Sequence, residues 1–223
     1  MQIQLNNTGK RFNKEWIFRN CHYTFNTGIA YAITGPNGSG KSTLLQTIAG
    51  AINASEGNVS VNSDQLTVNS DGSSENGQRK TIDNALLYQY ISIAAPYLEL
   101  VEEMTATEAL NFHSAFKPLL KGITIDEILT EVGLNAAAHK QIRYYSSGMK
   151  QRIKLAQAIF SDVPILLLDE PCTNLDATGY SLYHQLIKDY CAHKLVIVCS
   201  NDPQEYDFCT EKLDIMEYKT SKY

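Results

Sequence analysis

The sequence has no excess of positive charge. Its 223 residues contain 19 Lys and Arg against 24 Asp and Glu, a net charge of −5. This balance argues against a general nucleic-acid binder, because phosphate backbones select for a basic surface. The chain also has no N-terminal signal-peptide pattern and no run near the ~20 apolar residues of a membrane span. We therefore expect a cytoplasmic protein, with any membrane contact made through a partner.

Cysteine is scarce, odd in number and scattered. The five residues show neither metal-ligand spacing nor a disulfide framework: Cys21, Cys172, Cys191, Cys199 and Cys209. We expect reduced thiols that pack as small apolar groups. Hydrophobic residues make up 43% of the chain, which is enough for a sizeable core.

The hydrophobic pattern alternates between strand and helix periods. Short apolar runs separated by turn residues over 1–33 predict strands, several of them antiparallel. The stretch 103–160 has mostly helical spacing. The continuous apolar runs in PILLLDE and KLVIVCS, separated by the helix-length segment 177–192, predict a βαβ unit with buried parallel strands.

Two polar stretches interrupt or end this pattern. The segment from Ser63 to Lys80 is rich in Ser, Asn, Asp and Gly, and we interpret it as a surface loop or a short hairpin. The tail from Lys212 to Tyr223 alternates in polarity and predicts a last edge strand.

A glycine-rich loop joins a predicted strand to a predicted helix and fits the G-x-x-x-x-G-K-[ST] pattern in full. Glycines let the backbone curl so that successive N–H groups converge on phosphate oxygens, and the helix start adds its positive end. We expect Lys41 to reach the β- and γ-phosphates of ATP and the Ser42 hydroxyl to hold Mg²⁺. The predicted contacts are Gly35, Pro36, Asn37, Gly38, Ser39, Gly40, Lys41, Ser42 and Thr43.

Two adjacent carboxylates follow the apolar run Ile165–Leu168. Ligands of open α/β sheets bind at the carboxyl ends of the strands, where Asp169 and Glu170 are expected. We predict that Asp169 binds Mg²⁺ and that Glu170, with Lys41, is catalytic by taking a proton from the attacking water.

The segment YSSGMKQR, residues 145–152, resembles the signature of the ATP-binding cassette (ABC) ATPases, L-S-G-G-Q followed by x-Q-R. It precedes the Asp169–Glu170 strand, and the segment 171–176, PCTNLD, follows that strand and resembles the family's D-loop. These motifs occur in order along nearly the whole chain.

The resemblance implies one ABC ATPase domain over 1–223. Its fold class is α/β, a P-loop NTPase core with a parallel-rich sheet, an antiparallel β subdomain and an inserted helical subdomain. The core with its β subdomain is expected over 1–95 and 161–223, and the helical subdomain with the signature over 96–160.

The resemblance also implies a head-to-tail dimer, with a second ABC ATPase subunit that we expect to be a second copy of this chain. Each ATP is then held between one copy's phosphate loop and the other's signature. Ser146 is expected to cap a helix, so that its hydroxyl and the Ser147 and Gly148 amides face a γ-phosphate. Asp176 ends the D-loop, and Phe12 lies where the family stacks an aromatic ring on adenine. A buried core position for Phe12, and Trp16 as the stacking residue, are alternatives.

Several positions depart from the family pattern. Ser147 replaces a signature glycine and Met149 replaces its glutamine. Pro96 aligns with a glutamine that contacts Mg²⁺ and water, and proline has no side-chain hydrogen bond to offer. Asn201 replaces the switch histidine, so it can donate to the γ-phosphate but cannot carry charge. Hydrolysis is therefore predicted to be slow.

By this resemblance the chain binds and hydrolyses ATP as a subunit of an ABC transporter. It would act with integral membrane transporter subunits, peripherally on the cytoplasmic face of the membrane. The segment from Tyr97 to Met104 is expected either to help form the groove for a membrane-subunit helix or to be a solvated face. An ATP-dependent binding switch with slow hydrolysis is the alternative function; a DNA-repair or translation ATPase fits less well, because the long insertion or duplicated half of those families is missing.

Overall fold

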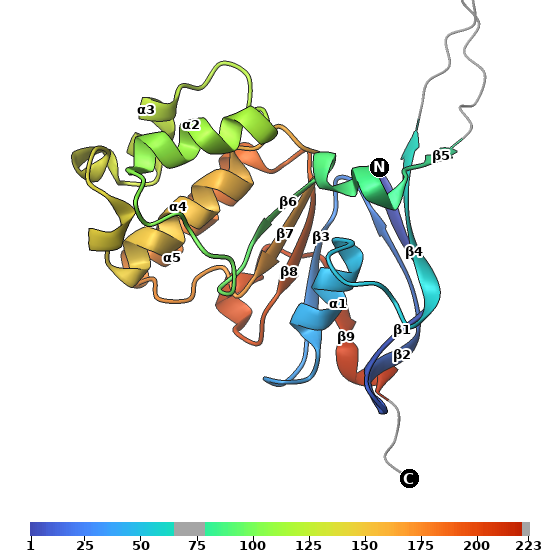
Figure 1. The fold of residues 1–223 in the computed structure, drawn as a ribbon. Helices are drawn as coiled ribbons and strands as arrows, with labels where there is room; N and C mark the ends of the chain where they lie inside the picture. The colour runs from blue at the N-terminus through green and yellow to red at the C-terminus, as the bar shows by residue number, and fades with distance from the viewer. Residues whose placement is uncertain (65–78, 220–223) are drawn as a thin grey trace, which may run out of the picture.

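The computed structural model describes residues 1–64 and 79–219, which form two β-sheets with helices around them (Figure 1). The strands are β1 (Gln2–Phe12), β2 (Glu15–Asn26), β3 (Ala30–Thr34), β4 (Glu56–Asp64), β5 (Arg79–Thr81), β6 (Ile91–Ala94), β7 (Ile165–Asp169), β8 (Leu195–Cys199) and β9 (Glu211–Asp214). The α-helices are α1 (Lys41–Ile48), α2 (Ala106–Phe116), α3 (Ile125–Glu131), α4 (Ser147–Ile159) and α5 (Ala177–Tyr190). Short 3₁₀ helices are η1 (Asn84–Gln89), η2 (Asn135–Ala137), η3 (Ile142–Tyr144), η4 (Pro203–Glu205) and η5 (Ile215–Tyr218). The predicted α/β class is confirmed.

A five-stranded sheet with the order β6-β7-β8-β3-β9 forms the centre, and all of its neighbouring strands are parallel. The two continuous apolar runs are β7 and β8, every residue of which is buried. The tail was predicted to be an edge strand from Lys212 to Tyr223, but only Glu211–Asp214 forms the edge strand β9. The chain then turns into η5, and residues 220–223 lie outside the described part of the chain. Because all strands run the same way, the loops after β3, β6, β7 and β8 gather at one edge of the sheet.

The predicted antiparallel strands form a second sheet with the order β2-β1-β4-β5. The polar stretch between β4 and β5 was predicted to be a loop or a hairpin. Its flanks pair antiparallel, with Ser63 opposite Lys80, whereas residues 65–78 lie outside the described part of the chain.

The parallel sheet is covered on both faces, as continuous apolar strands require. Successive side chains of a strand point to opposite faces, so Leu166 and Leu168 of β7 pack with the α2–α5 side while Ile165 and Leu167 pack with α1 and the antiparallel sheet. Figure 1 shows α2, α3, α4 and α5 on one side of the parallel sheet and α1 between the two sheets. All five cysteines are buried in these two cores, as predicted for thiols that pack as small apolar groups.

The helices on the outer side begin at side chains that the sequence supplies for this purpose. Thr105 and Glu108 form a capping box at the start of α2, and Thr124 and Glu127 form one at α3. Ser146 caps α4, where its Oγ accepts a hydrogen bond from the Met149 amide at 3.2 Å. A cap of this type stabilises a helix by ~1 kcal/mol. The start of the signature helix is thus fixed locally, as predicted.

Candidate functional site

The glycine-rich loop lies between β3 and α1, at the carboxyl edge of the parallel sheet. Gly35, Gly38 and Gly40 have φ angles of 143°, 74° and 102°, which residues other than glycine adopt only at a cost in free energy. At Gly40, which directly precedes α1, a Cβ atom would lie 2.4 Å from Cγ2 of Ile17. The loop therefore depends on glycine both for its curl and for its close packing against β2.

Lys41 is 5% exposed, and its ammonium group folds back into the loop. Its Nζ donates hydrogen bonds to the carbonyl oxygens of Gly35 at 2.8 Å and Pro36 at 3.1 Å. Within the described residues, the buried Oγ of Ser39 has no hydrogen-bond partner. The loop thus holds a positive charge and an unused polar group, which is a suitable environment for a phosphate.

Asp169 ends β7, is 1% exposed and has an Oδ1 atom without a hydrogen-bond partner in the described part of the chain. Burial raises the pKa of its carboxyl group and the nearby Glu170 adds to this, whereas a hydrogen bond with Ser42 and the charge of Lys41 oppose the rise. Carboxylate and hydroxyl oxygens are the ligands that Mg²⁺ prefers. The orphaned carboxylate oxygen beside Ser42 therefore fits a magnesium ion.

Glu170 follows Asp169 with a φ of 43°, in the left-handed region that non-glycine residues rarely adopt. Its amide donates to the carbonyl of Cys199 at 2.9 Å, which ties it to the end of β8. Asn201 comes two residues after that strand and is exposed. The structure thus brings the predicted Asp169, Glu170 and Asn201 to the same edge of the sheet as the glycine-rich loop.

Phe12 ends β1 and is 50% exposed, so a buried core position is ruled out for it. The Lys10 ammonium lies 5.1 Å from the centre of its ring. Trp16, the alternative stacking residue, is flanked by the guanidinium groups of Arg19 at 4.6 Å and Arg11 at 5.5 Å from its ring centre. Of the two aromatic rings, Phe12 is the more accessible.

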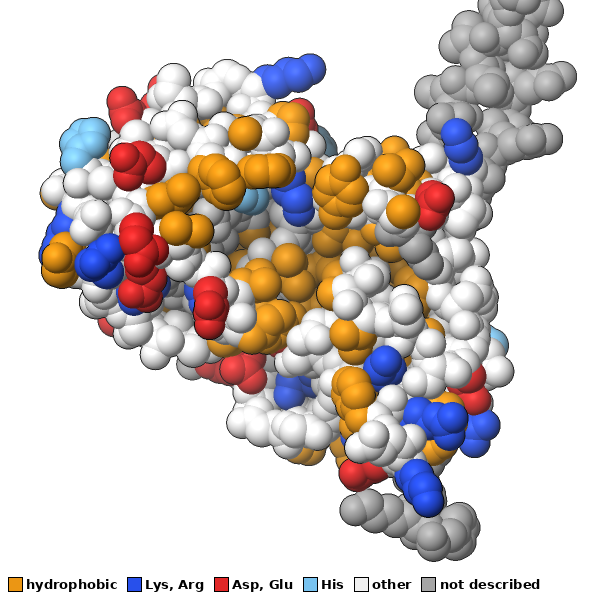
Figure 2. All heavy atoms as spheres, viewed as in Figure 1, with side chains coloured by type: hydrophobic (Ala, Val, Ile, Leu, Met, Phe, Trp, Pro, Cys, Tyr) orange, Lys and Arg blue, Asp and Glu red, His pale blue; other side chains and the backbone are white. Residues whose placement is uncertain are grey.

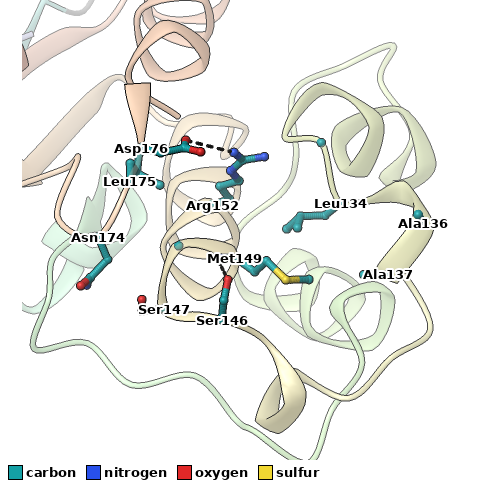
Figure 3. Close-up of a pocket in the computed structure, with 12 residues that line it drawn as sticks. Leu134, Ala136, Ala137, Ser146, Ser147, Met149, Arg152, Asn174, Leu175 and Asp176 are labelled. Carbon is teal, nitrogen blue, oxygen red and sulfur yellow. Dashed lines mark hydrogen bonds and ion pairs between the residues drawn. The ribbon is translucent and has the colours of Figure 1, made fainter. Parts of the chain in front are cut away.

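The signature residues lie elsewhere, at the start of α4 and away from α1 (Figure 1). They line a pocket of about 450 Å³ together with the D-loop residues. Figure 3 shows Ser146, Ser147 and Asn174 on one side of this pocket and Arg152 directed toward Asp176, with 3.9 Å between Nη2 and Oδ1. One chain therefore brings Ser146, Ser147, Gly148 and Asp176 together, but separates them from its own glycine-rich loop.

A sequence model of the ABC transporter family matches residues 18–173. The chain belongs to the ABC transporter family. The matched region of this ABC protein includes the glycine-rich loop, the signature and the paired carboxylates.

Relatives and solved structures agree with this assignment. The ABC protein is 31% identical to YybJ, an uncharacterized ABC transporter ATP-binding protein of Bacillus subtilis, over 83% of this chain and 78% of the relative. It is 28% identical to CcmA of Agrobacterium fabrum, a cytochrome c biogenesis ATP-binding export protein, over 91% and 90% of the two chains. A dimeric post-hydrolysis ATP-binding cassette bound to ADP and Pi has the same fold, with a TM-score of 0.75, 23% identity and coverage of 99% and 97%.

The ABC protein carries a tyrosine in the site that its sequence motifs did not predict there. Pro96, the residue aligned with the family glutamine, presents its carbonyl to the Lys154 ammonium at 2.9 Å. The next residue, Tyr97, is hydrogen-bonded to Gln46 of α1 and lies near Asp169. Burial raises the pKa of Tyr97 to about 12, and the negative charge of Asp169 adds to the rise. The signal in the sequence was a polar aromatic residue just after β6, at the edge where the other site residues follow their strands.

None of the helices in residues 1–64 and 79–219 of the ABC protein has both the length and the apolar character of a membrane-crossing helix.

Proposed function

We propose that this chain is the ATP-binding and ATP-hydrolysing subunit of an ABC transporter, and that it couples Mg-ATP-driven dimerisation and hydrolysis to transport by separate membrane subunits. The observation that carries the proposal is the meeting of Lys41, Ser42, Asp169 and Glu170 at one edge of the sheet. The membership of the ABC family and the similarity to CcmA support it.

Each proposed role follows from the position of its residue. Amides of the loop 35–40 and the start of α1 at Lys41–Thr43 bind the phosphates, while Lys41 turns from the loop carbonyls to the β- and γ-phosphates. Ser42 and Asp169 hold Mg²⁺, which supplies charge stabilisation for the leaving and transferred groups when bound. Glu170 takes the proton of the attacking water.

Residues outside the phosphate loop complete the nucleotide-binding site. Phe12 stacks on adenine, since stacking needs an accessible aromatic face and Phe12 has one. Asn201 donates a hydrogen bond to the γ-phosphate.

The separation of the signature from the phosphate loop supports a head-to-tail dimer. Ser146, Ser147 and Gly148, with the positive end of α4, face the γ-phosphate held by a second copy, and Asp176 lies beside them. We assign the signature to a helical subdomain over 96–160 and the remainder of 1–223 to the core and β subdomain. Loss of the γ-phosphate then releases the two copies.

Slow hydrolysis is the proposed consequence of Pro96 and Asn201. Replacing Asn201 with histidine is expected to increase the turnover rate by about tenfold or more, because histidine adds a cationic donor at the γ-phosphate. The wild-type rate should lie well below the ~10 s⁻¹ of a typical enzyme. Phosphate release from Mg-ATP measures both, with Asn6→His on the exposed part of β1 as the control. An unchanged rate in Asn201→His would show that Asn201 does not limit turnover.

A hollow with apolar side chains marks the proposed docking site for a membrane subunit. Figure 2 shows these side chains gathered between the α2–α4 side of the molecule and the part containing α1 and η1. Phe112 and Phe116 of α2 are 51% and 66% exposed, and their ring centres lie 5.0 Å apart. The Lys117 ammonium donates to the Ile91 carbonyl and so brings the end of α2 to the start of β6. Exposed aromatic patches of this kind are typical of binding surfaces.

Two acidic residues of the Tyr97–Met104 segment form ion pairs with basic residues of η3 and α4. Glu102 forms an ion pair with Lys150 of α4, and Glu103 lies 3.5 Å from Arg143. The first pair holds the segment against the signature helix, and the second holds it against η3. We propose that a membrane-subunit helix seated beside it acts on α4, and that the protein is peripheral to the cytoplasmic face of the membrane through this contact.

Affinity purification tests the transporter function. The tagged Glu170→Gln variant, purified from detergent-solubilised native membranes with Mg-ATP, is expected to recover a stoichiometric polytopic membrane protein. Phe116→Ser should reduce that recovery about tenfold or more, because it removes an exposed aromatic anchor. Met216→Ser, at an exposed apolar position in η5, should leave it unchanged. Recovery of a soluble self-dimer alone would instead favour the ATP-dependent binding switch.

A further inference from the structure

The peptide group between Pro171 and Cys172, which follows Glu170, is hydrogen-bonded to side chains at both its carbonyl oxygen and its N–H; these two side chains grip it. The carbonyl oxygen of Pro171 accepts a hydrogen bond from Nε2 of Gln151 at 2.7 Å. The N–H of Cys172, which belongs to the same peptide group, donates to Oε1 of Glu205 at 2.8 Å. Both gripping side chains are 3% exposed. Their hydrogen bonds are therefore shielded from water and fix the plane of this peptide.

The two gripping residues come from opposite sides of the site. Gln151 lies on α4 within the signature segment, about one turn after Gly148, whereas Glu205 ends η4, which follows Asn201. The gripped peptide directly follows Glu170. The signature helix, the proposed base and the segment after Asn201 thus meet at one planar group.

Glu170 needs such support because of its backbone. Its φ of 43° is strained for a non-glycine residue and persists only where neighbouring contacts hold it. Two backbone bonds contribute, from its own amide to Cys199 O and from the Thr173 amide to its carbonyl at 3.1 Å. The Gln151 and Glu205 hydrogen bonds act on the peptide immediately after it and restrict the same turn.

The signature helix also contacts the far end of this segment. Arg152 lies 3.9 Å from Asp176, and a Cβ atom added at Gly148 would lie 2.9 Å from the Asn174 carbonyl oxygen. Segment 170–176 is consequently bound to α4 along its length, so a shift of α4 is transmitted to the turn that carries Glu170.

Glu205 is poorly placed if its only role is stability. Within the described residues its buried Oε2 has no hydrogen-bond partner, which is a cost for a buried carboxyl group. Its backbone carbonyl is held separately, by the Tyr183 hydroxyl at 2.9 Å. The contacts of the carboxyl group are instead the Cys172 amide and the side chain of Ser200, which directly precedes Asn201.

We propose that Gln151 and Glu205 are positioning residues that act through the Pro171–Cys172 peptide group. They hold Glu170 in its working orientation and couple the signature helix to the segment after Asn201. This inference rests on the proposed role of Glu170 as the base.

The test uses variants of the full chain that differ at the hydrogen-bonding atoms. Glu205→Met and Gln151→Met each remove one grip at similar side-chain length, while Glu205→Gln keeps an oxygen acceptor for the Cys172 amide. Tyr183→Phe is the matched control, because it removes a hydrogen bond to Glu205 without touching the gripped peptide. Single-turnover hydrolysis, ATP affinity, Tm and hydrogen exchange over 170–176 are measured for each.

Both methionine variants are expected to lose about 10²-fold in single-turnover rate, the cost of a misplaced catalytic group, with ATP affinity unchanged within about twofold. Amide exchange over 170–176 should rise about tenfold, and Glu205→Gln should restore rate and protection. The double methionine variant should be little slower than either single variant, since both act on one peptide.

A strictly additive double variant would overturn the inference, as would Tyr183→Phe and Glu205→Met losing rate, affinity and Tm to the same extent. Glu170→Gln is measured alongside to separate the two proposals. If it keeps the wild-type rate, the base assignment fails, and hydrogen exchange alone then decides whether the grip exists. If it is inactive while the methionine variants hydrolyse normally, the positioning role fails and the base assignment stands.

Discussion

Replacing Glu170 with glutamine is expected to lower the rate of ATP hydrolysis by about 10²–10⁴-fold and to leave ATP affinity nearly unchanged. Glutamine keeps the shape of the side chain but cannot take a proton from water. Because Lys41 and the glycine-rich loop remain, ATP still binds. The ATP-bound head-to-tail dimer should then accumulate, since the step that separates the copies is blocked.

Phosphate release and size-exclusion chromatography with light scattering, both with Mg-ATP, measure the two effects. Glu217→Gln on the exposed part of η5 is the matched control and should hydrolyse at the wild-type rate without a dimer. A Glu170→Gln protein that turns over ATP normally would mean that another group accepts the proton. Loss of ATP binding in the same variant would instead indicate a damaged fold.

Asp169→Asn is expected to raise the Tm of the nucleotide-free protein while nearly abolishing Mg-dependent hydrolysis. The carboxyl group is 1% exposed and one of its oxygens has no partner among the described residues. A neutral amide removes the cost of burying the charge, and a gain of about 1 kcal/mol corresponds to roughly 2–4 °C for a domain of this size. The same change removes an anionic ligand for Mg²⁺, so hydrolysis should fall by about 10²-fold or more.

The pH dependence of the Tm difference shows whether the buried charge of Asp169 is its cause. Burial raises the pKa of Asp169 above its value in the unfolded chain, so the folded protein prefers the protonated form. The stability contributed by the proton is present below the unfolded pKa and is lost as pH rises through the folded pKa. The Tm advantage of Asp169→Asn should therefore be largest near neutral pH and disappear toward pH ~4.

Thermal unfolding at several pH values, together with a Mg²⁺ titration of hydrolysis, measures this pair of effects. Asp162→Asn, at an exposed position before β7, is the control and should show neither. A lower Tm for Asp169→Asn at neutral pH would show that the carboxylate is stabilised in the folded protein. Full hydrolysis in this variant would exclude Asp169 from the magnesium site.

Local chemistry made much of the fold predictable. The four consecutive apolar residues of β7 fit a strand covered on both faces, and the Thr105–Glu108 and Thr124–Glu127 spacings mark helix starts without any tertiary information. The glycines followed by lysine and serine predicted the loop before α1, because residues other than glycine rarely adopt its backbone angles. The exposure of Phe12 was not predictable, because an aromatic residue at a strand end packs inward or outward according to the neighbouring elements.

Contacts between segments far apart in the chain could not be predicted from the spacing of residues in the sequence. Tyr97 was predicted, with the segment to Met104, to help form a groove or to be part of a solvated face. Its hydroxyl is hydrogen-bonded to Gln46 and lies near Asp169, the last residue of β7, the strand beside β6. Gln151 and Glu205 are 54 positions apart in the sequence. They bind the same peptide group only because α4 and η4 both pack against the turn after Glu170.

The sequence by itself determined many of the elements, the family and most of the candidate site residues, because loop curvature, helix capping and strand burial depend on neighbours in the chain. Only the tertiary structure decided which of those residues share an edge and which do not. It put Asp169 beside Ser42, kept Ser146 away from the glycine-rich loop of the same chain, and closed two hydrogen bonds on the Pro171–Cys172 peptide. Those outcomes depend on how the parallel sheet and the helices covering it pack together, and packing is a property of the whole chain.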